Sequence, residues 1–226
     1  MRPIEITPLA QGGPAEQSEA QALLGEFSAL LRRIGPSAAS CPPGFFVSSQ
    51  ISNANAAPPS LGLFLETYQA RLLLPVELPA IAEACDHAAH GRVRELLALD
   101  RRLAEEPLLQ RFADGSRQAG RAQLERLRPL RDDRTLRRYL AAVDAGEAQG
   151  WHTLVFGIML AIYSWPLRQG LLHFGRETMA GLALAASAAP DSSAQVGDQM
   201  LEALFAQMPA AIDDLIARQD IRLAVA

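Results

Sequence analysis

The stretch WHTLVFGIMLAIY, residues 151–163, decides the fold of this chain. A helix over these residues is apolar on all sides, so we expect it to lie buried at the centre of the molecule. Its apolar run is about half of the roughly 20 residues that a membrane-spanning helix needs. The first residues, Met1 to Gly13, contain Glu5 and lack the apolar core of a signal peptide. We therefore expect a soluble, cytoplasmic protein in which other helices surround this one.

Amphipathic patterns lie on both sides of the central stretch. Apolar residues recur there at three- and four-residue steps, which is the spacing of one helix face. The patterns predict helices over 23–34, 61–74, 76–89, 93–106, 108–127, 136–143, 166–190, 196–205 and 212–216, with Pro75 ending the second of them. We find neither the two-residue alternation of strands nor a fixed-period repeat. The prediction is an all-α fold, a single helical-bundle domain of about ten helices over residues 15–222, after a flexible N-terminus at residues 1–14.

The basic residues are unusual because all 21 of them are arginine, against 25 acidic residues and a net charge of −4. Without lysine there is no Schiff base and no phosphate-loop lysine. The acidic balance argues against general nucleic-acid binding. Residues 91–138 nevertheless hold 13 arginines against 8 acids. This segment fits either a docking face for an acidic partner or solvated helix faces with local ion pairs.

The residues that most resemble a metal site are Cys85, Asp86, His87 and His90. His87 and His90 share a helical face, and two imidazoles with a carboxylate suit nickel or zinc. A closed site needs four ligands, however, and one helix end supplies only two or three. We therefore favour an exposed helix C-terminus, keep Cys85, His87 and His90 as a weaker metal hypothesis, and expect neither a metal nor a cofactor. The motifs of the common hydrolases, nucleotide-binding proteins and zinc proteases are absent from the sequence, so we expect no enzyme.

The segment Pro42-Pro43-Gly44-Phe45-Phe46-Val47-Ser48-Ser49-Gln50 interrupts the helical patterns. Two aromatic side chains stand there beside glycine and small polar residues. A loop of this kind is either held in the core or offered to a partner, and the residues alone favour neither.

Several short motifs resemble the UreF family of urease accessory proteins. The family signature reads Leu-Pro-Val-Gly-Gly/Ala-Phe/Tyr-x-aromatic-Ser-Gln-Gly-Leu-Glu. The matching residues are Pro42, Gly44, Phe46, Ser49 and Gln50 in that signature, then Glu77-Leu78-Pro79, Gln118-Ala119-Gly120, His152 to Gly157, and Pro166-Leu167. The sequence departs from the family at Ser48, at Ile51-Ser52-Asn53 and at Pro190-Asp191-Ser192-Ser193.

The resemblance implies an adaptor that helps to assemble the nickel centre of urease. Members of the family form helical homodimers, bind the accessory protein UreD (also called UreH), recruit the GTPase UreG and serve apo-urease, with a proposed role in controlling the GTPase. By resemblance, the partner contacts are Pro42, Gly44, Phe45, Phe46, Ser49, Gln50, Arg117, Gln118 and Gly120. The structural motif residues are His152, Gly157, Pro166 and Leu167. No nucleic acid and no membrane is implied.

Three alternatives stay open. The chain fits an unrelated all-α dimerising or ligand-sensing module, although it lacks a helix-turn-helix with a basic recognition helix. It also fits a helical metal-handling protein that uses Cys85, His87 and His90. The departures from the family signature permit a UreF relative with a drifted role.

Overall fold

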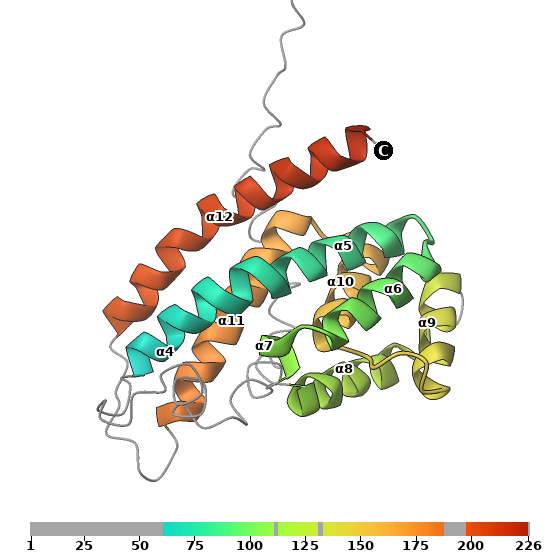
Figure 1. Cartoon of the computed structure of the whole chain (residues 1–226), viewed down its shortest axis with the longest axis horizontal. Helices are drawn as coiled ribbons and strands as arrows, with labels where there is room; N and C mark the ends of the chain where they lie inside the picture. The colour runs from blue at the N-terminus through green and yellow to red at the C-terminus, as the bar shows by residue number, and fades with distance from the viewer. Residues whose placement is uncertain (1–60, 111–112, 131–132, 188–197, 226) are drawn as a thin grey trace, which may run out of the picture.

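Every regular element in residues 61–110, 113–130, 133–187 and 198–225, which the computed structural model describes, is a helix (Figure 1). This confirms the all-α class. The total of about ten helices and the domain limits at residues 14 and 15 stay predictions, because they involve residues outside that part of the chain. The described elements are, in order, α4 Leu61–Tyr68, η1 Gln69–Glu77, α5 Leu78–Ala89, α6 Val93–Ala104, α7 Pro107–Gln110, α8 Ala113–Leu127, α9 Arg134–Asp144, α10 His152–Ile162, α11 Leu167–Ser187 and α12 Asp198–Val225.

The prediction that Pro75 ends a helix is wrong. The elements α4, η1 and α5 follow one another without a break, and Pro75 lies inside the π-helical part, η1. Proline has no N–H to donate, which ordinarily breaks an α-helix. In η1 the hydrogen bonds reach one residue further back, as in the bond from the Leu78 N–H to the Leu73 carbonyl. This wider turn accommodates the proline, so the helix continues without a break from α4 through η1 into α5.

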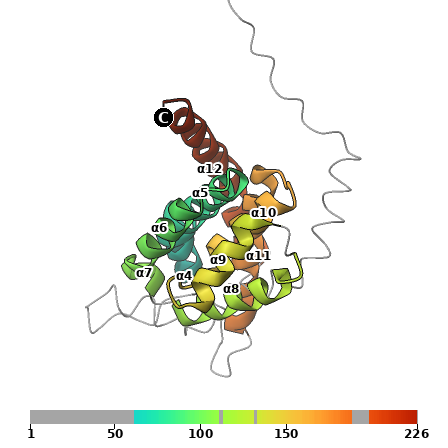
Figure 2. The ribbon, with the colours of Figure 1, turned by 90° about the vertical axis from the view of Figure 1, so that its right-hand side faces the viewer.

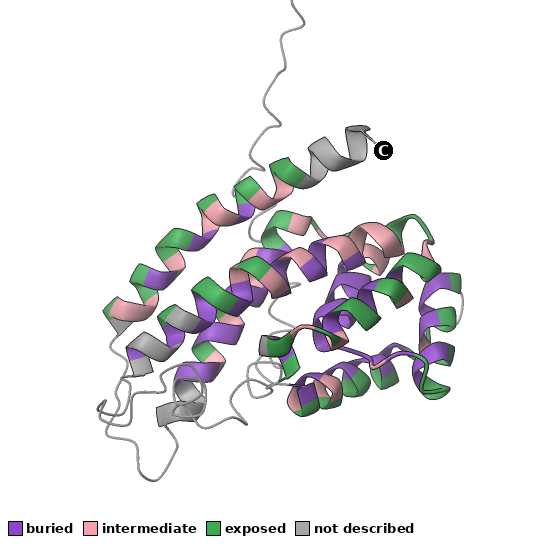
Figure 3. Ribbon diagram, in the orientation of Figure 1, coloured by how far each residue is buried: buried purple, intermediate pink, exposed green. Residues whose placement is uncertain are grey.

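Helix α10 lies at the centre of the helices, as the sequence predicts. All nine residues from His152 to Leu160 are buried, and α5 and α8 pack against this helix (Figure 3). Gly157 allows the close approach of α5. A Cβ atom on this glycine would lie 2.5 Å from the Ile81 carbonyl oxygen and 2.7 Å from the Ala84 Cβ.

The prediction of two separate helices over 196–205 and 212–216 is also wrong, because their described residues, 198–205 and 212–216, all belong to α12, which contains Pro209. Leu204, Met208 and Ile212 are buried at four-residue steps along one face of it. Burial of this stripe on both sides of the proline offsets the lost hydrogen bond. The C-terminal end of α12 extends away from the other helices (Figure 2). Within the described residues, no helix has the length and apolarity needed to cross a membrane.

Candidate functional site

Helix α8 and the start of α10 bring two of the sequence motifs together. Gly120 on α8 lies directly against the backbone that leads into α10. A Cβ atom at this position would lie 1.9 Å from the Gly150 carbonyl oxygen and 2.9 Å from the His152 nitrogen. Only glycine permits this contact, so Gly120 acts through packing. The aromatic loop with Pro42, Gly44, Phe45, Phe46, Ser49 and Gln50 lies outside the described residues.

Two neighbours of Gly120 reach the surface of α8. Gln118 is exposed, whereas Arg117 is half-buried and held by its own chain. The Arg117 guanidinium donates to Gln149 Oε1 at 2.9 Å and to Asp114 Oδ1 at 2.8 Å, and it lies over the Trp151 ring. These interactions of Arg117 hold the loop before α10 in place, so its guanidinium is only partly available for contact with a partner protein. The exposed Gln118 remains the better candidate for a partner contact.

Beneath this surface lies a buried polar chain that links four helical elements. Ser116 Oγ on α8 lies 2.5 Å from His152 Nδ1 on α10. On the other side of the imidazole, His152 Nε2 is 3.9 Å from Glu77 Oε1 at the end of η1. The Tyr68 hydroxyl donates to Glu77 Oε2 at 2.7 Å. The His152 ring also stacks on Phe174 of α11, with centroids 5.5 Å apart.

Burial controls the protonation of this chain. It lowers the pKa of His152 to about 3, since a charged imidazole loses its hydration there. It raises the pKa of Glu77 to about 7, against the lowering effect of the hydrogen bond from Tyr68. At neutral pH the imidazole is therefore neutral. Ser116 and His152 are the residue types of a nucleophile and its base, but they are 0% and 2% exposed, so no substrate reaches them.

A second buried acid was not singled out from the sequence. Asp100 on α6 is 1% exposed and accepts from the Tyr139 hydroxyl at 2.7 Å and from the backbone N–H of Gln149 at 2.8 Å and of Gly150 at 3.2 Å. Its carbonyl oxygen accepts from Trp151 Nε1 at 3.1 Å. These bonds fix the loop before α10 to α6 and α9. The sequence does contain a signal for this site, because Asp100 lies on the apolar face of an amphipathic helix. A carboxylate buried at such a position needs hydrogen-bond donors around it.

The weaker metal hypothesis gains no geometric support. Within the described residues, no three His, Cys, Asp or Glu side chains are grouped closely enough to hold a metal ion. Asp86 is engaged by Arg92 and lies 3.1 Å from His90 Nδ1. Burial, together with the charge of Asp86, raises the pKa of the Cys85 thiol to about 11. This disfavours the thiolate that a metal would require.

The last two motif residues lie at the beginning of a helix. Pro166 precedes α11 directly, and its carbonyl oxygen accepts the first turn's bond from the Gly170 N–H at 3.0 Å. Leu167 is the first residue of α11 and packs against the core. This agrees with the predicted start of a long helix.

Comparison of the sequence with known proteins assigns the chain to a family. The sequence model of the UreF family matches residues 56–205. The chain belongs to the UreF family, whose members are urease accessory proteins and not enzymes. No curated protein matches the chain, and no solved structure matches it either.

Proposed function

We propose that this protein is an adaptor in the assembly of the urease nickel centre. In this role it binds a UreD/UreH-type accessory protein, recruits a UreG-type GTPase, influences that GTPase, and serves apo-urease as a cytoplasmic homodimer. The observation that carries the proposal is the family match over residues 56–205. Nickel is cargo in this role, and the chain needs no cofactor of its own.

The surface of α8 supports the proposal. Gln118 lies exposed beside a shallow hollow that it lines together with Asp114, Arg117 and Arg121. Beneath it, Gly120 packs on the backbone of Gly150, which leaves little freedom for the helix to move. A rigid element that presents polar side chains is suited to recognition. The aromatic loop around Phe46 is the second contact that we propose, by resemblance alone.

The test is co-purification with a UreD-type partner after co-expression. We expect Gln118→Ala and Phe46→Ala each to reduce the amount of partner recovered, while the helical circular dichroism stays unchanged. Arg126→Ala is the matched control, since Arg126 is exposed on α8 and makes no ion pair within the described residues. Normal recovery with both variants, or an equal loss with the control, contradicts these contacts.

A relative with a drifted role is the second candidate. It is favoured by the departures from the family signature at residues 48–53 and 190–193. Complementation separates the two candidates. We expect the gene to restore urease activity in a host that lacks its own UreF, whereas a drifted protein binds a partner other than UreD and restores none.

A further inference from the structure

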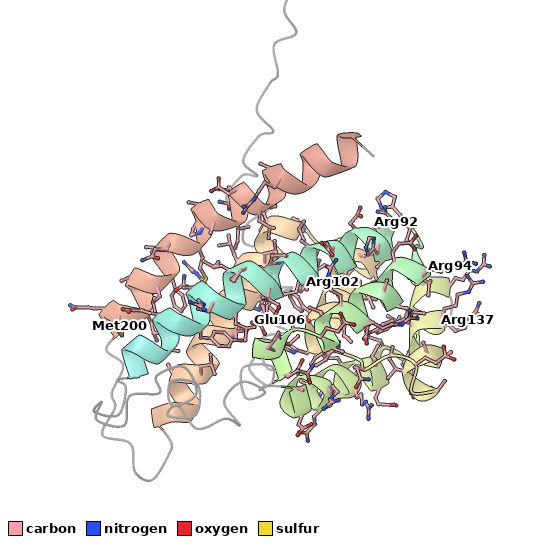
Figure 4. All side chains as sticks on the ribbon, viewed as in Figure 1. Arg92, Arg94, Arg102, Glu106, Arg137 and Met200 are labelled. Atoms are coloured by element: carbon pink, nitrogen blue, oxygen red, sulfur yellow. The ribbon has the colours of Figure 1, made fainter. Side chains whose placement is uncertain are left out.

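We propose that the exposed sides of α6 and α9, two helices that pack against each other, form a docking face for a glutamate- and aspartate-rich segment of a partner protein. The face consists of five exposed arginines, which we call the arginine face: Arg94, Arg101, Arg134, Arg137 and Arg138. Arg94 and Arg137 extend toward the same side of the molecule (Figure 4). The inference goes beyond the urease role, because it rests only on the charges of this chain.

Contacts between α6 and α9 bring the arginines together. Gly91, just before α6, lies next to Thr135 at the start of α9, with 3.8 Å between its Cβ position and Thr135 Oγ1. Further along, Tyr139 donates to Asp100 at 2.7 Å. Thr135, Tyr139 and Asp100 are buried, so α6 and α9 pack against each other through these residues. Arg94 and Arg101, which are seven positions apart, share one face of α6, and Arg134, Arg137 and Arg138 share one face of α9 at three- and four-residue steps.

None of the five arginines of this face makes an ion pair with a described residue, a property that they share with other exposed arginines such as Arg71, Arg121 and Arg126. Other described arginines are paired with a carboxylate, namely Arg92 with Asp86, Arg102 with Glu83, Arg117 with Asp114, Arg128 with Glu125 and Asp144, and Arg168 with Asp213. Among the described residues, the acidic neighbours of the five arginines in the sequence that reach the surface are Glu95 and Asp133. Five positive charges therefore stand beside two negative ones, and this part of the surface is positive although the chain as a whole carries a net charge of −4.

Their positions along the helices add to the positive potential. Arg134 is the first residue of α9, and Arg94 is the second residue of α6. The N-terminal end of a helix carries partial positive charge, so basic residues there are unfavourable for the helix itself. Each of these helix ends also has an acid, since Asp133 caps α9 by accepting from the Leu136 N–H at 2.7 Å and Glu95 lies in the first turn of α6. The arginines beside these acids add positive charge that the helices themselves do not need.

A carboxylate-rich protein segment fits the face better than a nucleic acid. Guanidinium groups form paired hydrogen bonds with carboxylates. A long polyphosphate binds through an extended positive surface, whereas this face consists of five arginines on a chain of net negative charge. Leu97 also stands on α6 between Arg94 and Arg101, packed on the core while still partly exposed. An apolar contact among the charges is typical of a protein interface.

The experiment uses the full chain and a fluorescein-labelled, glutamate-rich helical peptide, with fluorescence anisotropy as the readout. The double variant Arg94→Glu/Arg137→Glu reverses two charges of the face. The control Arg71→Glu/Arg126→Glu makes the same change in net charge at two exposed arginines on η1 and α8, which also lack ion pairs among the described residues. Thermal melts followed by circular dichroism verify that both variants fold.

We expect the double variant to bind the peptide at least about tenfold more weakly and the control to stay within about twofold of the wild type. Added salt should weaken wild-type binding, and a glutamine-rich peptide of equal length should not bind. An equal loss in both variants overturns the proposal, since binding then follows net charge. Tighter binding of a DNA duplex than of the peptide, or no peptide binding at low salt, overturns it as well.

Discussion

Replacement of the buried acid Glu77 by glutamine tests the electrostatics of the core most directly. Glu77 is 2% exposed, and Glu77→Gln keeps its size and an oxygen that accepts from the Tyr68 hydroxyl. The variant removes only the ability to ionise. We expect it to be more stable than the wild type above neutral pH and close to it in mild acid.

The expected magnitude follows from the raised pKa. The carboxyl has an ordinary pKa of 4.5 in the unfolded chain and a pKa of about 7 in the fold. As pH rises above 4.5, the unfolded state loses its proton first, so the folded protein loses stability until pH passes about 7. One pKa unit corresponds to about 1.4 kcal/mol, so the total loss is about 3 kcal/mol. Glutamine does not ionise and avoids this loss.

His152 acts in the opposite direction. Its pKa falls from 6.5 to about 3 in the fold, so stability decreases as pH falls from 6.5 toward 3. Wild type and variant share this effect. The difference between the two proteins therefore isolates the contribution of Glu77.

Urea unfolding followed by circular dichroism at several pH values between 4.5 and 8.5 gives this difference. The stability gain of Glu77→Gln should grow by about 3 kcal/mol across the interval. Glu66→Gln is the control, because Glu66 is exposed on α4, and its difference from the wild type should stay flat. A gain that is constant with pH, or a loss that grows with pH, refutes the reasoning.

Two further substitutions test packing and hydrogen bonding. Gly120→Ala should lower the free energy of unfolding by about 3 kcal/mol or more, because the new Cβ would meet the Gly150 carbonyl oxygen at 1.9 Å. Its control, Arg121→Ala on the exposed side of α8, should leave the midpoint of a urea titration within error. Tyr139→Phe removes the bond to Asp100 and should lower stability by about 1–3 kcal/mol. An unchanged urea midpoint for Tyr139→Phe would mean that water replaces the hydroxyl.

Much of the helical arrangement was predictable from local pattern. The stretch around Phe156 is apolar on every side, and burial is the only environment in which such a helix is stable, so the central place of α10 followed from the sequence. The breaks assigned at Pro75 and between residues 205 and 212 did not occur. Local rules describe how much a proline or a stretch of low helix propensity destabilises a helix. The burial that offsets this destabilisation comes from residues that are distant in the sequence.

The candidate site was predictable in part. Gln118, Gly120 and His152 were recognised by their resemblance to family motifs. The contact between Gly120 and the backbone of His152 was not predictable, since 32 positions separate the two residues in the chain and no local rule gives their distance in space. The role of Asp100 was missed because its partners Tyr139 and Gln149 meet it only in the folded chain.

By itself, the sequence determined that this is an all-helical protein of the UreF type with an arginine-only positive segment. Composition, periodicity and motifs depend on residues that are near one another in the chain, so they can be read directly from the sequence. Only the tertiary structure decided which of the described arginines form ion pairs with carboxylates and which do not. It also decided that an acid is buried beside a histidine. Coulomb energy and desolvation depend on distance and solvent exposure, and both are fixed only when remote helices pack together.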